Sequence, residues 1–380
     1  MSGPTEVKRG LAGVTADTSA VSVVDEESGS LLYRGYPVPE LAASCSFEEV
    51  AYLIWHGELP TTSQLEELVS AERSRRQVPA VLSQALSGLP PTCHPMDILR
   101  TAVSYLGALD PSEDDPSPEA ELEKSLDLWA KLPTIVAAEQ RRRHGQPPIA
   151  PDPDLSFCDN FFHMCTGRVP DEDVVRSFEI SMVLYAEHGF NASTFTARVI
   201  TSTLSDLYSA ITGAIGALKG PLHGGANEAV MGIFTEVTSP GQVDGWLSST
   251  LASGQKVMGF GHRVYKHGDS RVPTMRAALE RLARTSDEGG QVMAVYDRLE
   301  RAMQESKGLY PNLDYATGPA YYLMGFDIPT FTPIFVMSRI TGWTAHVIEQ
   351  RANNALIRPL SAYIGQPRRA LPSTAKGKLA

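Results

Sequence analysis

Three of the nine histidines stand in glycine-rich or short polar segments. They are His188 in AEHGFNAST, His223 in GPLHGGANEAV and His262 in GFGHRVYKHGDSR. A histidine beside glycine lies where the main chain is tight and a ligand can come close, and its imidazole can exchange a proton near neutral pH. For a single histidine of this kind, a hydrogen-bonded turn residue is the commoner explanation. Three in one chain favour a site for acid–base chemistry.

Other kinds of site find less support in the residue spacing. No HExxH, HxH or His/Cys pair with metal-ligand spacing occurs, and the separation of His262 from His267 is a weak metal signal. No GxSxG marks a serine nucleophile. GFGHRV lacks the third glycine of a dinucleotide site, and GALKG is not a phosphate-binding loop. We therefore predict no metal and no tightly bound cofactor.

Several segments resemble one family, in the same order along the chain. GFGHRVYKHGDSR, from Gly259 to Arg271, carries the citrate synthase signature at all its fixed positions. AEHGFNASTFTARV, GPLHGGANEAV and PNLDYATG resemble the segments that hold a substrate histidine, the first catalytic histidine and the catalytic aspartate. SRITGWTAHVIEQ and NNALIRPLSAYIG also match, so the resemblance covers residues 8–367. Within the family, the chain looks most like short dimeric bacterial enzymes, the actinobacterial 2-methylcitrate synthases and dual citrate/2-methylcitrate synthases.

The resemblance implies a catalytic set of His223, His262 and Asp314. The α-carbon of an acyl thioester is a weak acid, so a carboxylate base needs a donor on the developing enolate oxygen. Asp314 would be the base, His223 that donor, and His262 the acid for the ketone oxygen of oxaloacetate. Residues 224–227 look like a helix start, whose positive end disfavours a charged imidazole. From the residues alone, Asp314 could equally be a helix cap.

Oxaloacetate carries two carboxylates, and guanidinium groups bind carboxylates through paired hydrogen bonds. The resemblance assigns this role to Arg271, Arg339 and Arg358, with His188 as a further donor. In the family, the equivalent of Arg358 reaches the site of the partner subunit, which implies a homodimer. Without the resemblance, each arginine would be explained as a solvated surface charge.

Acyl-CoA is expected as a substrate and not as a resident cofactor. By resemblance it lies along the loop before His262. The residues expected to contact it are Lys256, Val257, Met258, Gly259, Phe260, Gly261, Lys266 and Lys307. The lysines are candidate phosphate contacts, although a lysine at the surface is common.

The sequence pattern predicts a mostly α fold with short strands within residues 10–36. Ser46 with Glu49 predicts a capping box, and the alanine- and glycine-rich residues 207–218 predict a buried or subunit-interface helix. The resemblance implies a large dimerising domain, residues 1–224 plus 326–380. It also implies an inserted small helical domain, residues 225–325, which closes over the substrates and excludes water.

The composition is that of an ordinary globular protein, with 42% hydrophobic and 20% charged residues. A net charge of -11 argues against nucleic acid or an anionic membrane as partner, and an anionic substrate then needs a local cluster of cations. The scattered cysteines predict free thiols in a reducing compartment. No apolar segment is long enough for a signal or a membrane span, so we expect a cytoplasmic protein.

The predicted reaction condenses propionyl-CoA and/or acetyl-CoA with oxaloacetate, followed by hydrolysis to 2-methylcitrate and/or citrate plus CoA. Propionate metabolism and the tricarboxylic acid cycle are the corresponding pathways. Discrimination between the two acyl groups depends on one methylene, worth about 1–3 kcal/mol. Leu313-Asp314-Tyr315 differs from the Asp-Ala-His of many citrate synthases, which favours a modified acyl pocket. The alternatives are a strict citrate synthase, an inactive regulatory paralogue and a lyase that runs the condensation backwards.

Overall fold

Helices form most of the protein, with one small sheet near the N-terminus, as predicted. The computed structural model describes residues 7–25, 29–265 and 268–370. Its elements, in chain order, are η1 (Arg9–Leu11), β1 (Ser22–Val24), β2 (Leu31–Tyr33), β3 (Tyr36–Pro37), α1 (Val38–Ser44), α2 (Phe47–His56), α3 (Thr62–Arg75), α4 (Ala80–Ser87), α5 (Pro95–Leu109), α6 (Pro118–Arg143), α7 (Phe157–Thr166), α8 (Glu172–Tyr185), α9 (Ala192–Thr201), α10 (Leu207–Leu218), α11 (Ala226–Glu236), η2 (Pro240–Gln242), α12 (Val243–Ala252), α13 (Val272–Thr285), α14 (Gly289–Lys307), α15 (Leu313–Leu323), η3 (Ile328–Thr330) and α16 (Phe331–Ala352).

The three strands form an antiparallel sheet in the order β1-β2-β3. Ser22 pairs with Tyr33, and Tyr33 also pairs with Tyr36 across the β2–β3 turn. The strands are short, and Leu31 and Tyr33 of β2 are buried while Leu32 between them is half-buried. The sheet therefore anchors the N-terminal segment on the helical core through one face.

Polar side chains fix where the helices begin. The predicted capping box is confirmed, because Ser46 Oγ accepts from the Glu49 amide at 3.2 Å and the Glu49 carboxylate accepts from the Ser46 amide at 2.7 Å. Asn191 caps α9 and Asn312 caps α15. Because a cap sets the first residue of a helix, Asn191 places Ser193 in the first turn of α9, and Asn312 places Asp314 in the first turn of α15.

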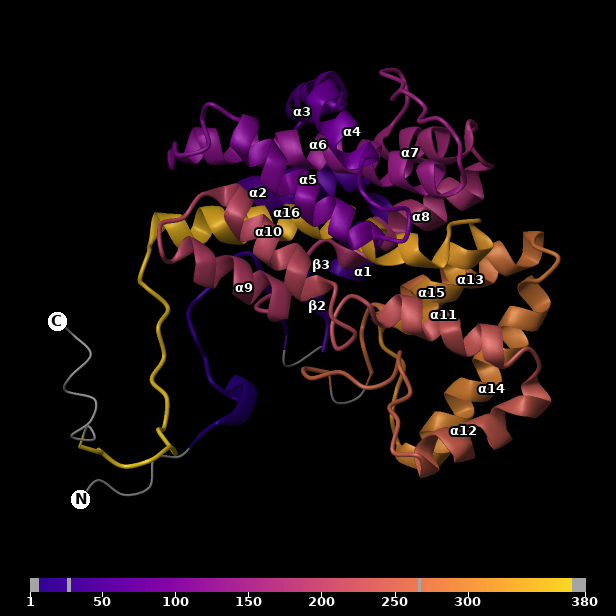
Figure 1. Ribbon diagram of the computed structural model, residues 1–380. Coiled ribbons are helices and arrows are strands. Elements are labelled where there is room, and N and C mark those ends of the chain that lie inside the picture. The colour runs from indigo at the N-terminus through magenta and orange to yellow at the C-terminus, as the bar shows by residue number, and fades with distance from the viewer. Residues whose placement is uncertain (1–6, 26–28, 266–267, 371–380) are drawn as a thin grey trace. The chain divides into compact units, whose positions relative to one another are not determined.

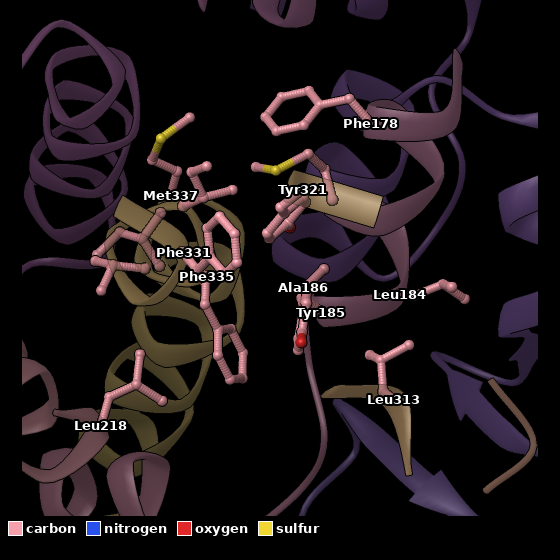
Figure 2. Packing of buried hydrophobic residues seen from close by; sticks show 14 of the residues in the cluster. Phe178, Leu184, Tyr185, Ala186, Leu218, Leu313, Tyr321, Phe331, Phe335 and Met337 are labelled. Atoms are coloured by element: carbon pink, nitrogen blue, oxygen red, sulfur yellow. The ribbon is translucent and has the colours of Figure 1, made fainter. Parts of the chain in front are cut away.

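The long helix α16 runs through the interior (Figure 1). It packs against α2, α5, α6, α8, α9, α10 and α11. Its Phe331 and Phe335 share a core with Tyr185 of α8 and Tyr321 of α15 (Figure 2). A helix that contacts neighbours on all sides must bury its polar residues too, so Arg339 is held inside the protein.

Small residues let α9 and α10 approach closely. A side-chain carbon at Gly213 of α10 would lie 2.3 Å from Ile200 Cδ1 of α9. Leu207, Ile211 and Leu218 of α10 are fully buried. The expectation of a buried helix is therefore confirmed, whereas its alternative as a subunit interface stays a prediction.

The described residues fall into two compact units, Ser19–Ala355 and the terminal segments within Met1–Thr18 and Leu356–Ala380. Within the first, α11, α13, α14 and α15 pack on one another, and α13 also packs against α8. The division into a large domain and a small domain at residues 225–325 remains a prediction. All four cysteines are free thiols. In the part of the chain that is described, no helix has the length and apolarity to cross a membrane.

Candidate active site

His223 lies in the loop between α10 and α11, where α11 begins at Ala226 as the sequence indicated. Its Nε2 accepts a hydrogen bond from the Ser193 amide at 3.3 Å and lies 2.7 Å from Ser193 Oγ. Because a main-chain N–H can only donate, Nε2 carries no proton and the ring proton is on Nδ1. Trp343 Nε1 donates to Ser193 Oγ at 3.0 Å and holds this residue in place.

His262 is held through its other nitrogen. Its Nδ1 accepts from the amides of Val264 at 3.1 Å and Tyr265 at 3.4 Å. The ring proton is therefore on Nε2. His223 and His262 thus offer opposite nitrogens as donors, each fixed by a main-chain amide behind it.

Both catalytic candidates among the histidines are neutral at physiological pH. Burial, assisted by the Arg339 guanidinium, lowers the pKa of His223 to about 3. Burial and then Arg271 lower the pKa of His262 to about 4, although Asp269 opposes this. The sequence analysis also expected a neutral His223, because of the helix start that follows it. The lowered pKa of His223 is instead caused by burial and by the Arg339 charge. Each imidazole is therefore an N–H donor without a charge.

Asp314 lies in the first turn of α15, where the Asn312 side chain accepts from its amide at 3.1 Å. Its Oδ1 accepts from the Tyr185 hydroxyl at 2.6 Å. Burial raises the pKa of Asp314 to about 6, while the Tyr185 hydrogen bond and the Arg271 charge act in the opposite direction. A carboxylate in this range is charged at neutral pH and more basic than an exposed aspartate.

The loop that carries His262 is tied to the segment that carries Asp314. Gly261 donates to the Tyr310 carbonyl at 2.8 Å, and the Asn312 amide donates to the Gly259 carbonyl at 2.9 Å. Only glycine fits at position 259, because φ is +87° and a Cβ there would lie 2.7 Å from Val230. The glycines of the signature therefore allow two distant chain segments to meet.

His188 and Arg271 lie beside His262. The ring centroids of His188 and His262 are 5.0 Å apart, and His188 Nε2 lies 3.1 Å from the Tyr265 hydroxyl. Arg271 is buried and donates from Nε and Nη2 to the two oxygens of Asp269, at 2.9 and 2.7 Å. Burial would raise the pKa of Asp269, but Arg271 lowers it to about 2. This ion pair fixes the guanidinium.

Arg339 differs from Arg271 because it has no ion pair with a carboxylate among the residues described. It is 2% exposed, and its Nε donates to the Tyr185 carbonyl at 2.6 Å. Its guanidinium carbon lies 4.7 Å from the centre of the Phe335 ring. Burial lowers the pKa of Arg339 to about 10, so the group stays charged. The Glu187 carboxylate compensates part of this charge, but no carboxylate among the described residues accepts a hydrogen bond from the guanidinium, and a buried guanidinium of this kind favours an anionic ligand.

The remaining predicted contacts differ in their exposure to solvent. Lys256 and Lys307 are exposed, Val257 and Gly259 are buried, and Met258, Phe260 and Gly261 are half-buried. Phe260 packs on the Tyr315 ring at 4.4 Å. Arg358 belongs to the terminal unit and is exposed, whereas Lys266 lies outside the described residues. These assignments to substrates stay predictions.

Two residues beside the predicted set were not expected from the sequence. Tyr185, the last residue of α8, holds Asp314, and Ser193, in the first turn of α9, holds His223. Nothing in the residue pattern marks Tyr185. Ser193 follows the Asn191 cap, a signal for a helix start that places its amide among the unpaired donors of the first turn. Among the described residues, no group of three or more His, Cys, Asp or Glu gathers to hold a metal ion.

Neutral imidazole donors together with a basic carboxylate suit the activation of a carbon acid. The family model for "Citrate synthase, C-terminal domain" matches residues 10–360. The chain is 59% identical over 369 residues to 2-methylcitrate synthase from Mycobacterium tuberculosis, covering 97% of this chain and 93% of that protein. It is 60% identical over 365 residues to citrate synthase from Mycolicibacterium smegmatis, covering 96% and 97%.

The fold is also similar to that of a solved citrate synthase structure. Citrate synthase from Thermoplasma acidophilum, in a ternary complex with carboxymethyl coenzyme A and oxaloacetate, superposes with a TM-score of 0.93 at 32% identity, covering 98% of this chain and 99% of that one. The chain therefore belongs to the citrate synthase family. The predicted family and fold class are confirmed, and so is the predicted enzyme class, an acyltransferase that condenses an acyl-CoA with oxaloacetate.

Proposed function

We propose that this enzyme condenses propionyl-CoA or acetyl-CoA with oxaloacetate and hydrolyses the product to 2-methylcitrate or citrate plus CoA. One observation carries the proposal. His223 and His262 are neutral and present protons on opposite nitrogens, and Asp314 is a carboxylate with a pKa of about 6. This is the set of groups that enolisation followed by attack on a ketone requires.

In the first step, Asp314 removes a proton from the α-carbon of the acyl group. The raised pKa of Asp314 narrows the gap between base and carbon acid. The Nδ1–H of His223 donates to the thioester oxygen as negative charge develops there. A neutral imidazole suits this role because it stabilises an enol or enolate without first having to lose its own positive charge.

In the second step, the enol carbon attacks the ketone of oxaloacetate. Negative charge then grows on the ketone oxygen, and the Nε2–H of His262 donates to it. The main-chain amides behind Nδ1 keep that proton on Nε2 before reaction. Water finally cleaves the thioester of the condensation product and releases CoA.

Oxaloacetate is proposed to bind through its carboxylates. Arg339, buried without an ion pair among the described residues, supplies a free guanidinium edge, and Arg271 supplies a fixed one. His188 is a further donor next to His262. The family resemblance adds Arg358 from the partner subunit, so we propose a homodimer as the active unit.

Acyl-CoA is proposed to lie along residues 256–261, with Lys256, Lys266 and Lys307 near its phosphates. Closure of residues 225–325 over both substrates would exclude water until condensation has taken place. A cytoplasmic location and roles in propionate metabolism and the tricarboxylic acid cycle belong to the same proposal.

The acyl preference has two candidates, because the chain is nearly equally similar to a 2-methylcitrate synthase (59%) and a citrate synthase (60%). We propose that both acyl-CoA substrates react. The test is to compare kcat/KM for acetyl-CoA and propionyl-CoA with saturating oxaloacetate, by the release of free thiol. Turnover with acetyl-CoA alone would establish the strict citrate synthase and end the 2-methylcitrate proposal.

A further inference from the structure

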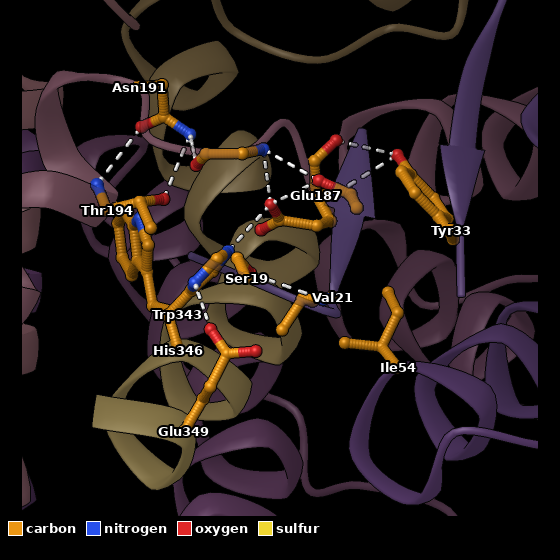
Figure 3. Close-up of polar contacts among 12 residues, drawn as sticks. Ser19, Val21, Tyr33, Ile54, Glu187, Asn191, Thr194, Trp343, His346 and Glu349 are labelled. Carbon is orange, nitrogen blue, oxygen red and sulfur yellow. Dashed lines mark hydrogen bonds and ion pairs between the residues drawn. The ribbon is translucent and has the colours of Figure 1, made fainter. Parts of the chain in front are cut away.

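A buried polar network surrounds Glu187, the residue before His188 (Figure 3). Its centre is His346 of α16, which is 0% exposed and lies between the carboxylates of Glu187 and Glu349. The Arg198 guanidinium of α9 donates to Glu349 at 2.7 Å. Glu349 also accepts from the Ala20 amide at 2.7 Å. The network thus joins α9, α16 and the segment before β1 within one compact unit.

Glu187 determines the turn that carries His188. Its Oε1 accepts from the Ser22 hydroxyl at 2.9 Å and also from the amide of Gly189. Ser22 Oγ in turn accepts from the same Gly189 amide at 2.8 Å. The hydroxyl of Tyr33 accepts from the Glu187 amide at 3.1 Å and donates to the Glu187 carbonyl at 2.9 Å. Residues 187 and 189 are therefore both fixed, and His188 projects from between them.

The position of the Glu187 carboxylate depends on His346. His346 Nε2 lies 2.9 Å from Glu187 Oε1. On the other side of the ring, Arg198 Nη1 lies 3.1 Å from Nδ1, and a guanidinium can only donate. Burial would lower the pKa of His346, but the Glu187 carboxylate raises it. In either protonation state Nε2 carries a proton and donates it to Glu187.

We propose that His346 is a positioning residue for oxaloacetate, which acts through Glu187 on the turn that orients His188. This inference rests on the proposed function, because it assigns His188 to oxaloacetate. Loss of the His346 bond leaves the buried Glu187 carboxylate with the Ser22 hydroxyl and the Gly189 amide as its hydrogen-bond donors. Because Glu187 and Gly189 flank His188, a shift of the carboxylate toward these donors would move residues 187–189. A displacement of the donor from its substrate is then expected to weaken binding.

Two neutral substitutions at one position separate the two sides of the imidazole. In His346→Gln the side-chain amide nitrogen takes the place of Nε2 and can still donate to Glu187. In His346→Asn the amide takes the place of Nδ1, and the bond to Glu187 is lost. We expect His346→Asn to raise KM for oxaloacetate about tenfold, with His346→Gln within about twofold of the unchanged enzyme. KM for acyl-CoA and kcat are expected to change by less than about threefold in both.

The two His346 variants are compared through their KM for oxaloacetate. Equal KM values for oxaloacetate in the two variants, whether raised or not, would overturn the role of the Glu187 bond. If His346→Asn does not fold, as judged by its thermal unfolding, Ser22→Ala replaces it, because this removes a hydroxyl that contacts both Glu187 and Gly189. Ser22→Ala should raise the same KM about threefold, and an unchanged KM would overturn the inference. An unsubstituted enzyme that releases no CoA would instead refute the proposed function.

Discussion

The two basic regions predicted to bind the substrates differ in their surroundings. Arg271 and Arg339 are 5% and 2% exposed and are fixed by Asp269 and by the Tyr185 carbonyl. Lys256 and Lys307 are exposed to solvent. A buried guanidinium has already lost its hydration, so a ligand anion gains most of the Coulomb energy, whereas an exposed lysine interacts through water and salt. We call Arg271 and Arg339 the inner region and Lys256 and Lys307 the outer region. Substitutions in the inner region should therefore change substrate binding strongly, and those in the outer region should change it little.

The largest effect is expected at the base itself. Asp314→Asn keeps the shape of the side chain but removes the group that accepts the proton, and kcat should fall about 10³-fold. Steady-state release of CoA measures this. Asp287→Asn, at an exposed carboxylate between α13 and α14, is the matched control and should leave kcat unchanged. A loss of less than tenfold at Asp314 would mean that another group is the base.

A smaller effect is expected at the inner arginine without an ion pair. Arg339→Lys keeps the charge but removes the planar group that donates to two carboxylate oxygens, so KM for oxaloacetate should rise about thirtyfold. The measurement varies oxaloacetate at saturating acyl-CoA. The control is Arg298→Lys on α14, where Arg298 pairs with Asp244 at the surface. If both variants bind oxaloacetate equally well, the inner region is not the carboxylate site.

Tyr185→Phe should reduce kcat at neutral pH about fivefold, equivalent to roughly 1 kcal/mol for one hydrogen bond. The hydroxyl stabilises the charged form of Asp314, so its removal raises the pKa of Asp314 above about 6. A base must be unprotonated to act, and the rate falls as pH decreases through its pKa. The acid limb of kcat/KM for acyl-CoA should therefore lie near pH 6 and move to higher pH in the variant. An acid limb at the same pH in both proteins would contradict this role.

The smallest effect is expected in the outer region. Lys256→Ala and Lys307→Ala should each raise KM for acyl-CoA about twofold to threefold, with kcat unchanged. The rise should shrink as the salt concentration approaches 1 M, because screening then acts over about 3 Å. A tenfold rise that persists in high salt would show that these lysines become buried when substrate binds, and the contrast between the two regions would no longer hold.

The sequence predicted helix starts and glycine-containing loops correctly where neighbouring residues alone determine the local structure. Ser46 and Glu49 form their capping box because both partners lie within one turn of helix. The glycines around His262 were conspicuous because positive φ leaves few alternatives, as at Gly259 and Gly261. The family motifs then joined these local signals into one catalytic hypothesis.

Hydrogen-bond partners that lie far apart along the chain could not be predicted from the sequence. Tyr185 and Asp314 are 129 positions apart, and their hydrogen bond depends on the contact between α8 and α15, which also brings Ser181 and Phe178 against Tyr321. His346 and Glu187 are 159 positions apart and meet only because α16 passes through the interior. Residue types alone also could not show that Arg271 has a carboxylate partner while Arg339 lacks one among the described residues. Such differences arise from tertiary packing, which no local pattern encodes.

The buried site is expected to join an acyl-CoA to oxaloacetate. The most direct measurement follows free CoA with a thiol reagent, for propionyl-CoA and acetyl-CoA in turn, with and without oxaloacetate. CoA release should require oxaloacetate for both acyl groups. Propionyl-CoA should give 2-methylcitrate and acetyl-CoA should give citrate, each in an amount equal to the CoA released. No release with either acyl-CoA, or release that is equally fast without oxaloacetate, would show that the site does not catalyse this condensation.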